Sequence, residues 1–116
     1  MSAHFQRAAL LMQQSRTELA EQELRLALAE DPNDARARGL LAVCLAEREA
    51  FREALAEAGQ AVHLAPDDPF TYYTLAGVLY HSNRPQEAEQ AIQEAIRLDP
   101  TDPDYQYRDI LPLPGP

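Results

Sequence analysis

The chain has 116 residues, enough for one domain, and a formal charge of −9 from 19 acidic and 10 basic residues, all ten of them arginine. An acidic surface argues against binding to nucleic acid or to anionic membranes, and it favours neutral or basic protein partners. Cys44 is the only cysteine, so no internal disulfide can form, and residues 1–7 lack the apolar stretch of a signal peptide. We therefore expect a cytoplasmic protein, and the use of arginine without lysine indicates a bacterial one.

Six helices are expected in chain order, at 3–14, 17–30, 35–47, 51–64, 69–81 and 85–98. Asp68-Pro69 and Asp102-Pro103 have the pattern of a helix start, an N-cap aspartate followed by proline at the first helical position. Residues 15–18 have the spacing of a capping box, with Ser15 as the cap, and residues 83–86 are a variant of it. No strand pattern competes with these helices.

Three prolines, Pro32, Pro66 and Pro100, are evenly spaced along the chain, and the interval between them is called one repeat length below. Each ends a predicted pair of helices, because proline cannot continue a helix. When the chain is aligned on these prolines, small and large apolar residues fall into repeated columns: Ala8, Ala42 and Ala76; Ala20, Ala54 and Ala88; Ala27, Ala61 and Ala95; Leu11, Leu45 and Leu79; Leu28, Val62 and Ile96. Alanine lets two helices approach closely, and the larger residues fill the space between helix ridges. The columns predict a stack of similar helical hairpins.

This pattern resembles the tetratricopeptide repeat over residues 1–102. The third unit fits best, with Tyr72, Leu75, Ala76, Leu79, Ala88, Ile92, Ala95 and Pro100 at the family's signature columns. The second unit has Arg38 where an aromatic residue is usual. The first has His4 and Arg7 at columns that are usually apolar, as expected of a solvated terminal unit. The resemblance implies an all-α fold, a right-handed superhelical stack of three hairpins at 1–34, 35–68 and 69–102, with a short capping helix and tail at 103–116.

The resemblance also implies a protein-binding scaffold, in which the first helix of each hairpin lines a concave groove. The groove residues expected to bind a peptide are Phe5, Met12, Arg36, Leu40, Val43, Phe70, Tyr73, Thr74, Tyr80 and His81. Some relatives hold a terminal carboxylate with lysine, arginine and asparagine there. The corresponding columns of this chain hold Phe5, Ala9, Val43, Phe70 and Thr74, so that clamp is absent. We expect an apolar or aromatic segment, extended or helical, to bind instead.

Two glycines, Gly39 and Gly77, lie on the same groove-facing side. Glycine within a helix costs roughly 1 kcal/mol relative to alanine, which indicates that something packs closely against each position. A bound partner and a neighbouring helix both fit this requirement.

No pattern indicates catalysis, a metal or a cofactor. His4, His63 and His81 lie in three different units at unrelated columns, and none has an acidic or cysteine partner at ligand spacing. Cys44 lies mid-helix beside Leu45 and is expected to be a buried structural thiol. The acidic residues fall at helical spacing with arginines nearby, as on a solvated face, and no phosphate-binding loop is present. The sequence therefore does not favour an enzyme.

The last residues, 103–116, are open to three interpretations: a short cap followed by a frayed end, a linker to a further domain, or a built-in ligand for the groove. Tyr105, Tyr107, Ile110 and Leu111 are apolar enough to cover the last hairpin, before the prolines after Leu111 enforce an extended chain. If the last hairpin is incompletely covered, the chain is expected to form a homodimer. Self-association, or a role as the first part of a longer repeat array, is the alternative to a ligand-binding scaffold.

Overall fold

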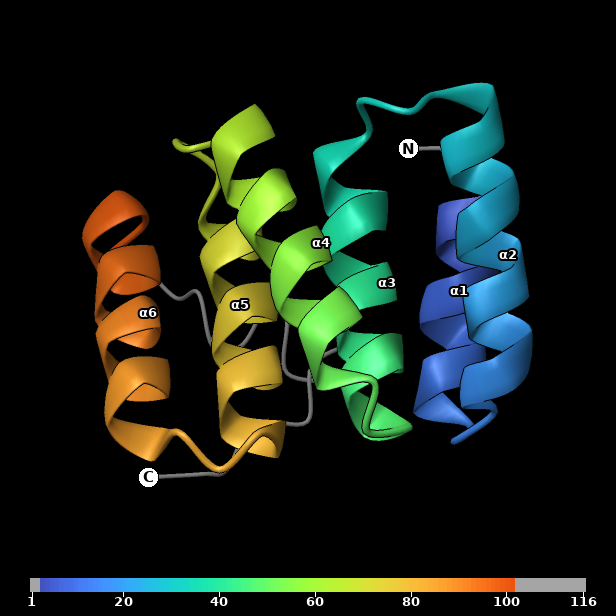
Figure 1. Cartoon of the computed structure of the whole chain (residues 1–116). Coiled ribbons are helices and arrows are strands. Elements are labelled where there is room, and N and C mark those ends of the chain that lie inside the picture. The colour runs from blue at the N-terminus through green and yellow to red at the C-terminus, as the bar shows by residue number, and fades with distance from the viewer. Residues whose placement is uncertain (1–2, 102–116) are drawn as a thin grey trace.

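The computed structural model describes residues 3–101, which form six helices and no strand within that range (Figure 1). Their bounds are Ala3–Gln13 (α1), Thr17–Glu30 (α2), Ala35–Glu47 (α3), Phe51–Leu64 (α4), Pro69–His81 (α5) and Pro85–Leu98 (α6). The helices lie where the sequence predicts them, and α1 ends one residue early. The expected cap and tail at 103–116 lie outside the described residues.

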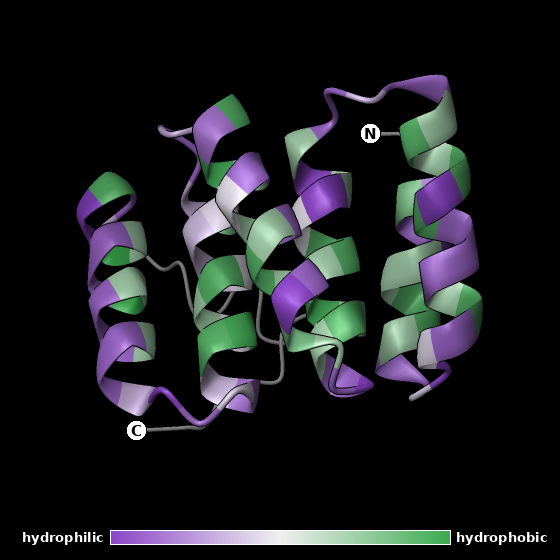
Figure 2. Ribbon diagram, in the orientation of Figure 1, coloured by the Kyte–Doolittle hydropathy of each residue, from purple (hydrophilic) through white to green (hydrophobic). Residues whose placement is uncertain are grey.

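Consecutive helices pair into three hairpins, α1–α2, α3–α4 and α5–α6, which stack side by side. The second helix of each hairpin packs on the first helix of the next, as α2 does on α3 and α4 on α5, and α3 also packs along α5. The lower turns of α3 and α5 are mainly hydrophobic in Figure 2, and nine residues of α3 and eight of α5 are buried. These helices form the centre of the stack.

The repeated alanine columns form the contacts between helices. All nine alanines of the three columns are buried, and the larger apolar residues Leu24, Leu41 and Leu45 are buried between them. One continuous cluster of buried residues extends from α1 to Ala95 of α6, and a smaller one joins α5 to α6 around Ala76 and Ala91. The predicted all-α repeat stack is therefore confirmed.

The turns inside the hairpins differ from the predicted capping boxes. Ser15, Glu49 and Asn83, which are also separated by one repeat length, adopt positive φ angles of 60°, 66° and 63°. The backbone N–H of the next residue bonds to the carbonyl five residues earlier, as Arg16 does to Leu11 at 2.8 Å. This is the Schellman ending of a helix. Ser15 is therefore not an N-cap, and neither α2 nor α6 has a side-chain cap hydrogen bond.

The starts of α3 and α5 are capped by aspartates at equivalent positions. Asp68 accepts a hydrogen bond from the Phe70 N–H at 3.0 Å, as the Asp-Pro pattern predicts. Asp34, one repeat length earlier, accepts one from the Ala37 N–H at 3.1 Å without a following proline. Each carboxylate satisfies a backbone donor that the helix leaves unpaired, and its charge is favourable at a helix N-terminus.

The left-handed conformation of Glu49 provides a test of the turn geometry. A residue with a Cβ in this region raises the free energy of the folded state by about 1–2 kcal/mol relative to glycine. Glycine also stabilises the unfolded chain by about 0.4–1 kcal/mol, because its backbone has more conformations there, and this offsets part of the benefit. We expect Glu49→Gly to raise the free energy of unfolding by about 0.5–1 kcal/mol in urea titrations. Glu49→Gln removes the charge but keeps the Cβ, so it is expected to be neutral. A gain from Glu49→Gln equal to that from Glu49→Gly would contradict the backbone explanation.

Candidate binding site on the first helices

The residues of α1, α3 and α5 that the sequence analysis assigns to the groove are called the inner face below. At one end of this face, Phe5 of α1 meets Phe70 of α5, with ring centroids 5.9 Å apart in an edge-to-face arrangement. The guanidinium carbon of Arg36, on α3, lies 5.1 Å from the centre of the Phe70 ring. Phe5 is 3% exposed and Phe70 is 1% exposed. The inner face thus brings together residues of all three hairpins, and we call Phe5, Arg36 and Phe70 the aromatic cluster.

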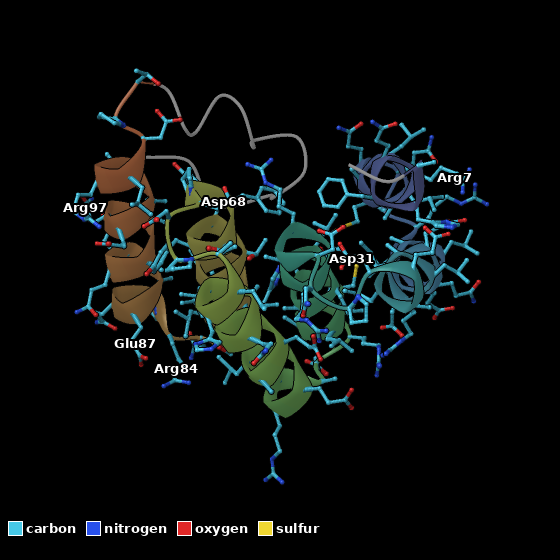
Figure 3. All side chains as sticks on the ribbon, turned by 90° about the horizontal axis from the view of Figure 1, so that it is seen from above. Arg7, Asp31, Asp68, Arg84, Glu87 and Arg97 are labelled. Atoms are coloured by element: carbon cyan, nitrogen blue, oxygen red, sulfur yellow. The ribbon has the colours of Figure 1, made fainter. Side chains whose placement is uncertain are left out.

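Arg36 is held in this position by Asp68. Its Nε and one terminal nitrogen donate to the two carboxylate oxygens of Asp68 at 2.7 and 2.9 Å, a bidentate pair. The same carboxylate caps α5. Figure 3 shows Asp68, seen from above, at the start of α5. One aspartate therefore orients the arginine and fixes the start of the helix that carries Phe70.

Four further groove candidates, Leu40, Val43, Tyr73 and Thr74, are buried along the middle of the inner face. Met12 is half-buried, and its sulfur lies 3.7 Å from the Cys44 sulfur, so it contacts α3. Tyr80 and His81 lie at the opposite end of α5 from Phe70, and both are exposed. Their ring centroids are 6.3 Å apart, and Tyr80 is 44% exposed. The predicted site therefore divides into a buried part and an exposed aromatic end.

Of the two explanations for glycine at position 39, the structure favours close packing of a neighbouring helix over contact with a bound partner. A Cβ added to Gly39 would overlap the Thr74 hydroxyl oxygen and lie 3.1 Å from both Thr74 side-chain carbons. The Thr74 hydroxyl is itself fixed, since it donates to the Thr71 carbonyl at 2.8 Å. Gly39 therefore permits the close contact between α3 and α5.

Cys44 is fully buried, as predicted, and burial raises the pKa of its thiol to about 12. The nearby carboxylates of Glu47 and Glu21 add to this shift. A thiol in this state is almost entirely protonated near neutral pH, and the thiolate is the nucleophilic form. Cys44 therefore acts as an apolar core residue.

The polar residues His4 and Arg7 of α1 contact acidic residues of α2. His4 Nδ1 lies 2.6 Å from Glu23 Oε2, and His4 Nε2 lies 3.2 Å from Glu30 Oε1, so two side-chain contacts join α1 to α2. The His4 hydrogen bond, aided by the charge of Arg7, lowers the pKa of Glu23. Within residues 3–101, no group of three or more histidine, cysteine or acidic residues could hold a metal ion.

One feature was not expected from the sequence: an open hollow of about 530 Å³ where α2 meets α3 and the start of α5. Its charged lining consists of Glu30, Asp31, Asp34, Arg36 and Asp68. The hollow adjoins the aromatic cluster through Arg36. In the sequence, an acidic site here could have been predicted from the repeated aspartates Asp34 and Asp68, which are one repeat length apart.

The family model for the tetratricopeptide repeat matches the chain twice, over residues 11–69 and 45–107. The chain belongs to the tetratricopeptide repeat family. No curated protein sequence matches it. Tetratricopeptide repeats generally mediate protein–protein interactions, which agrees with the expected class of function. None of the helices described is long and apolar enough to cross a membrane.

Gly39 and Gly59 form a matched pair for testing the contact between α3 and α5. Alanine is favoured over glycine in a helix by about 1 kcal/mol, and a Cβ at Gly59 on α4 would meet nothing within 4 Å. We therefore expect Gly59→Ala to stabilise the protein by up to about 1 kcal/mol. Gly39→Ala is expected to destabilise it by about 1–3 kcal/mol, because Thr74 cannot move away without breaking its own packing. Equal stabilisation by both variants in thermal or urea unfolding would refute the close contact.

Proposed function

We propose that this tetratricopeptide protein is a non-catalytic scaffold that binds an apolar or aromatic segment of another protein along its inner face. The observation that carries the proposal is the contact between Phe5 and Phe70, 5.9 Å apart at their ring centroids. Phe5 and Phe70 belong to the first and third hairpins, and Arg36 of the second hairpin lies over the Phe70 ring. A segment lying along this face would therefore contact all three repeats. Tyr80 and His81 extend the same face with exposed rings that can stack on an incoming side chain.

Charge favours a partner segment that is neutral or carries a basic residue. The hollow beside the aromatic cluster has four carboxylates and one guanidinium, and Arg36 is already paired with Asp68. A lysine or arginine of the partner would be attracted there, while an acidic segment would be repelled. At the columns where some relatives hold a terminal carboxylate with lysine, arginine and asparagine, this chain has none of these three residue types. These features favour recognition of an internal segment, and a reducing bacterial cytoplasm remains the expected setting.

The proposal is tested with peptides selected from a random phage-displayed library against the whole chain. Exposed aromatic residues often dominate binding energy, so Tyr80→Ala is expected to weaken the selected peptides by roughly tenfold, about 1.4 kcal/mol. Leu26→Ala is the matched control, since Leu26 is an exposed apolar residue on α2, away from the inner face. Affinities are measured by fluorescence anisotropy. If Tyr80→Ala and Arg36→Leu leave every selected peptide unaffected, the inner face is not the binding site.

Self-association is the second candidate function, and exposed leucines on the first hairpin favour it. Leu10, Leu19 and Leu26 are 54%, 41% and 51% exposed. Leu19 and Leu26 are seven residues apart and so share one side of α2. If this surface pairs two copies, the mass from sedimentation equilibrium should rise toward that of a dimer with concentration, and Leu19→Glu with Leu26→Glu should restore the monomer. A constant monomeric mass of the wild type at high concentration would exclude it.

A further inference from the structure

The described first helices carry three arginines, Arg7 on α1 and Arg36 and Arg38 on α3. Two of them pair with second helices: Arg7 Nε lies 3.4 Å from a carboxylate oxygen of Glu23 on α2, and Arg38 donates to Glu57 on α4 at 2.9 Å. Arg36 instead reaches the start of α5, the next first helix along the inner face. It is therefore the arginine that a segment lying along this face would meet.

The pairing of Arg36 with Asp68 determines what can cover this arginine. The two side chains are 29% and 19% exposed, so most of the bidentate pair is already withdrawn from water, and a bound segment would cover the rest. Covering a lone cation with apolar side chains costs its hydration. A guanidinium paired with a carboxylate has no net charge and keeps its strongest hydrogen bonds when it is covered. An apolar segment can therefore lie over Arg36 at a much lower cost when Asp68 is beside it.

We propose that Asp68 determines the charge specificity of the inner face. It neutralises Arg36, so that the face accepts an apolar or aromatic segment and rejects one that brings a carboxylate to this position. This inference rests on the proposed function above, since it assumes that a partner binds along the inner face. Without the charge of Asp68, Arg36 would require a carboxylate from the partner, and the preference would reverse.

Asp34 provides an internal comparison one repeat length earlier. Like Asp68, it caps a first helix and lines the open hollow. Within residues 3–101, however, no arginine forms an ion pair with it. The two aspartates therefore contribute the same charge and the same kind of cap, and they differ in the contact with Arg36. A change of specificity that follows from Asp68 and not from Asp34 would arise from that contact and not from the net charge.

Parallel selections from one phage-displayed peptide library test this assignment, with the wild type, Asp68→Asn and Asp34→Asn as targets. Asparagine keeps a capping oxygen while it removes the charge, so both variants should stay folded, as checked by circular dichroism. We expect acidic residues to be depleted in peptides from the wild type and from Asp34→Asn, and enriched in peptides from Asp68→Asn. In fluorescence anisotropy, these acidic peptides should bind Asp68→Asn roughly tenfold more tightly than the wild type.

Two further variants show which charge the acidic peptides recognise. Arg36→Leu combined with Asp68→Asn removes the cation, so the preference for acidic peptides should disappear. Asp68→Ser, which also keeps a capping oxygen without the charge, should acquire the preference as Asp68→Asn does. If the preference persists without Arg36, or if Asp34→Asn acquires it as strongly, the contact between Asp68 and Arg36 is not its source and the proposal is wrong.

The scaffold function and the role of Asp68 fail in different ways. If the wild type selects peptides that depend on Tyr80, and Asp68→Asn selects the same uncharged sequences, the scaffold function stands and Asp68 does not determine its specificity. If the wild type selects no peptide that depends on Tyr80 or Arg36, the scaffold function fails and the role of Asp68 fails with it.

Discussion

The close approach of neighbouring helices is the constraint on which the structure depends. It is set by alanine at three columns of each repeat, where any larger side chain would separate the helices. Because the columns recur at every repeat length, each hairpin meets its neighbour in the same way. Gly39 applies the same principle between two first helices, α3 and α5, where even the methyl group of alanine is too large. The orientation of the inner face follows from these short contacts.

The fold was predictable in detail because its signals are local and repeated. Proline spacing and the alanine columns determined all six helices to within a residue, and the mid-helix position of Cys44 predicted its burial. The hairpin turns were not predicted correctly. A serine or asparagine followed three residues later by glutamate or glutamine is typical of a capping box, yet Ser15 and Asn83 adopt left-handed conformations instead. The equivalent residue Glu49 shows that the turn geometry, and not the residue type, determines this conformation.

The candidate site was predictable only as a set of positions. Helical spacing indicates which residues share a face, but the packing of the hairpins on one another determines which of them meet. The contact between Phe5 and Phe70 joins residues of the first and third repeats, far apart in the sequence, and no pattern within one repeat contains it. Arg36 illustrates the same limit, because its orientation depends on Asp68 in the loop before the next first helix. Which candidates are buried and which, like Tyr80, remain exposed also depends on the assembled stack.

The contact between α1 and α5 has a consequence for how the protein unfolds. In a linear array, each repeat touches only its neighbours, so a terminal hairpin can open while the others stay folded. Here the edge-to-face pair of Phe5 and Phe70 connects the first hairpin to the third and bypasses the second. Opening either end breaks this connection in addition to the nearest-neighbour packing. The two ends are therefore energetically coupled, and the three hairpins should behave as one cooperative unit more than their linear order alone would allow.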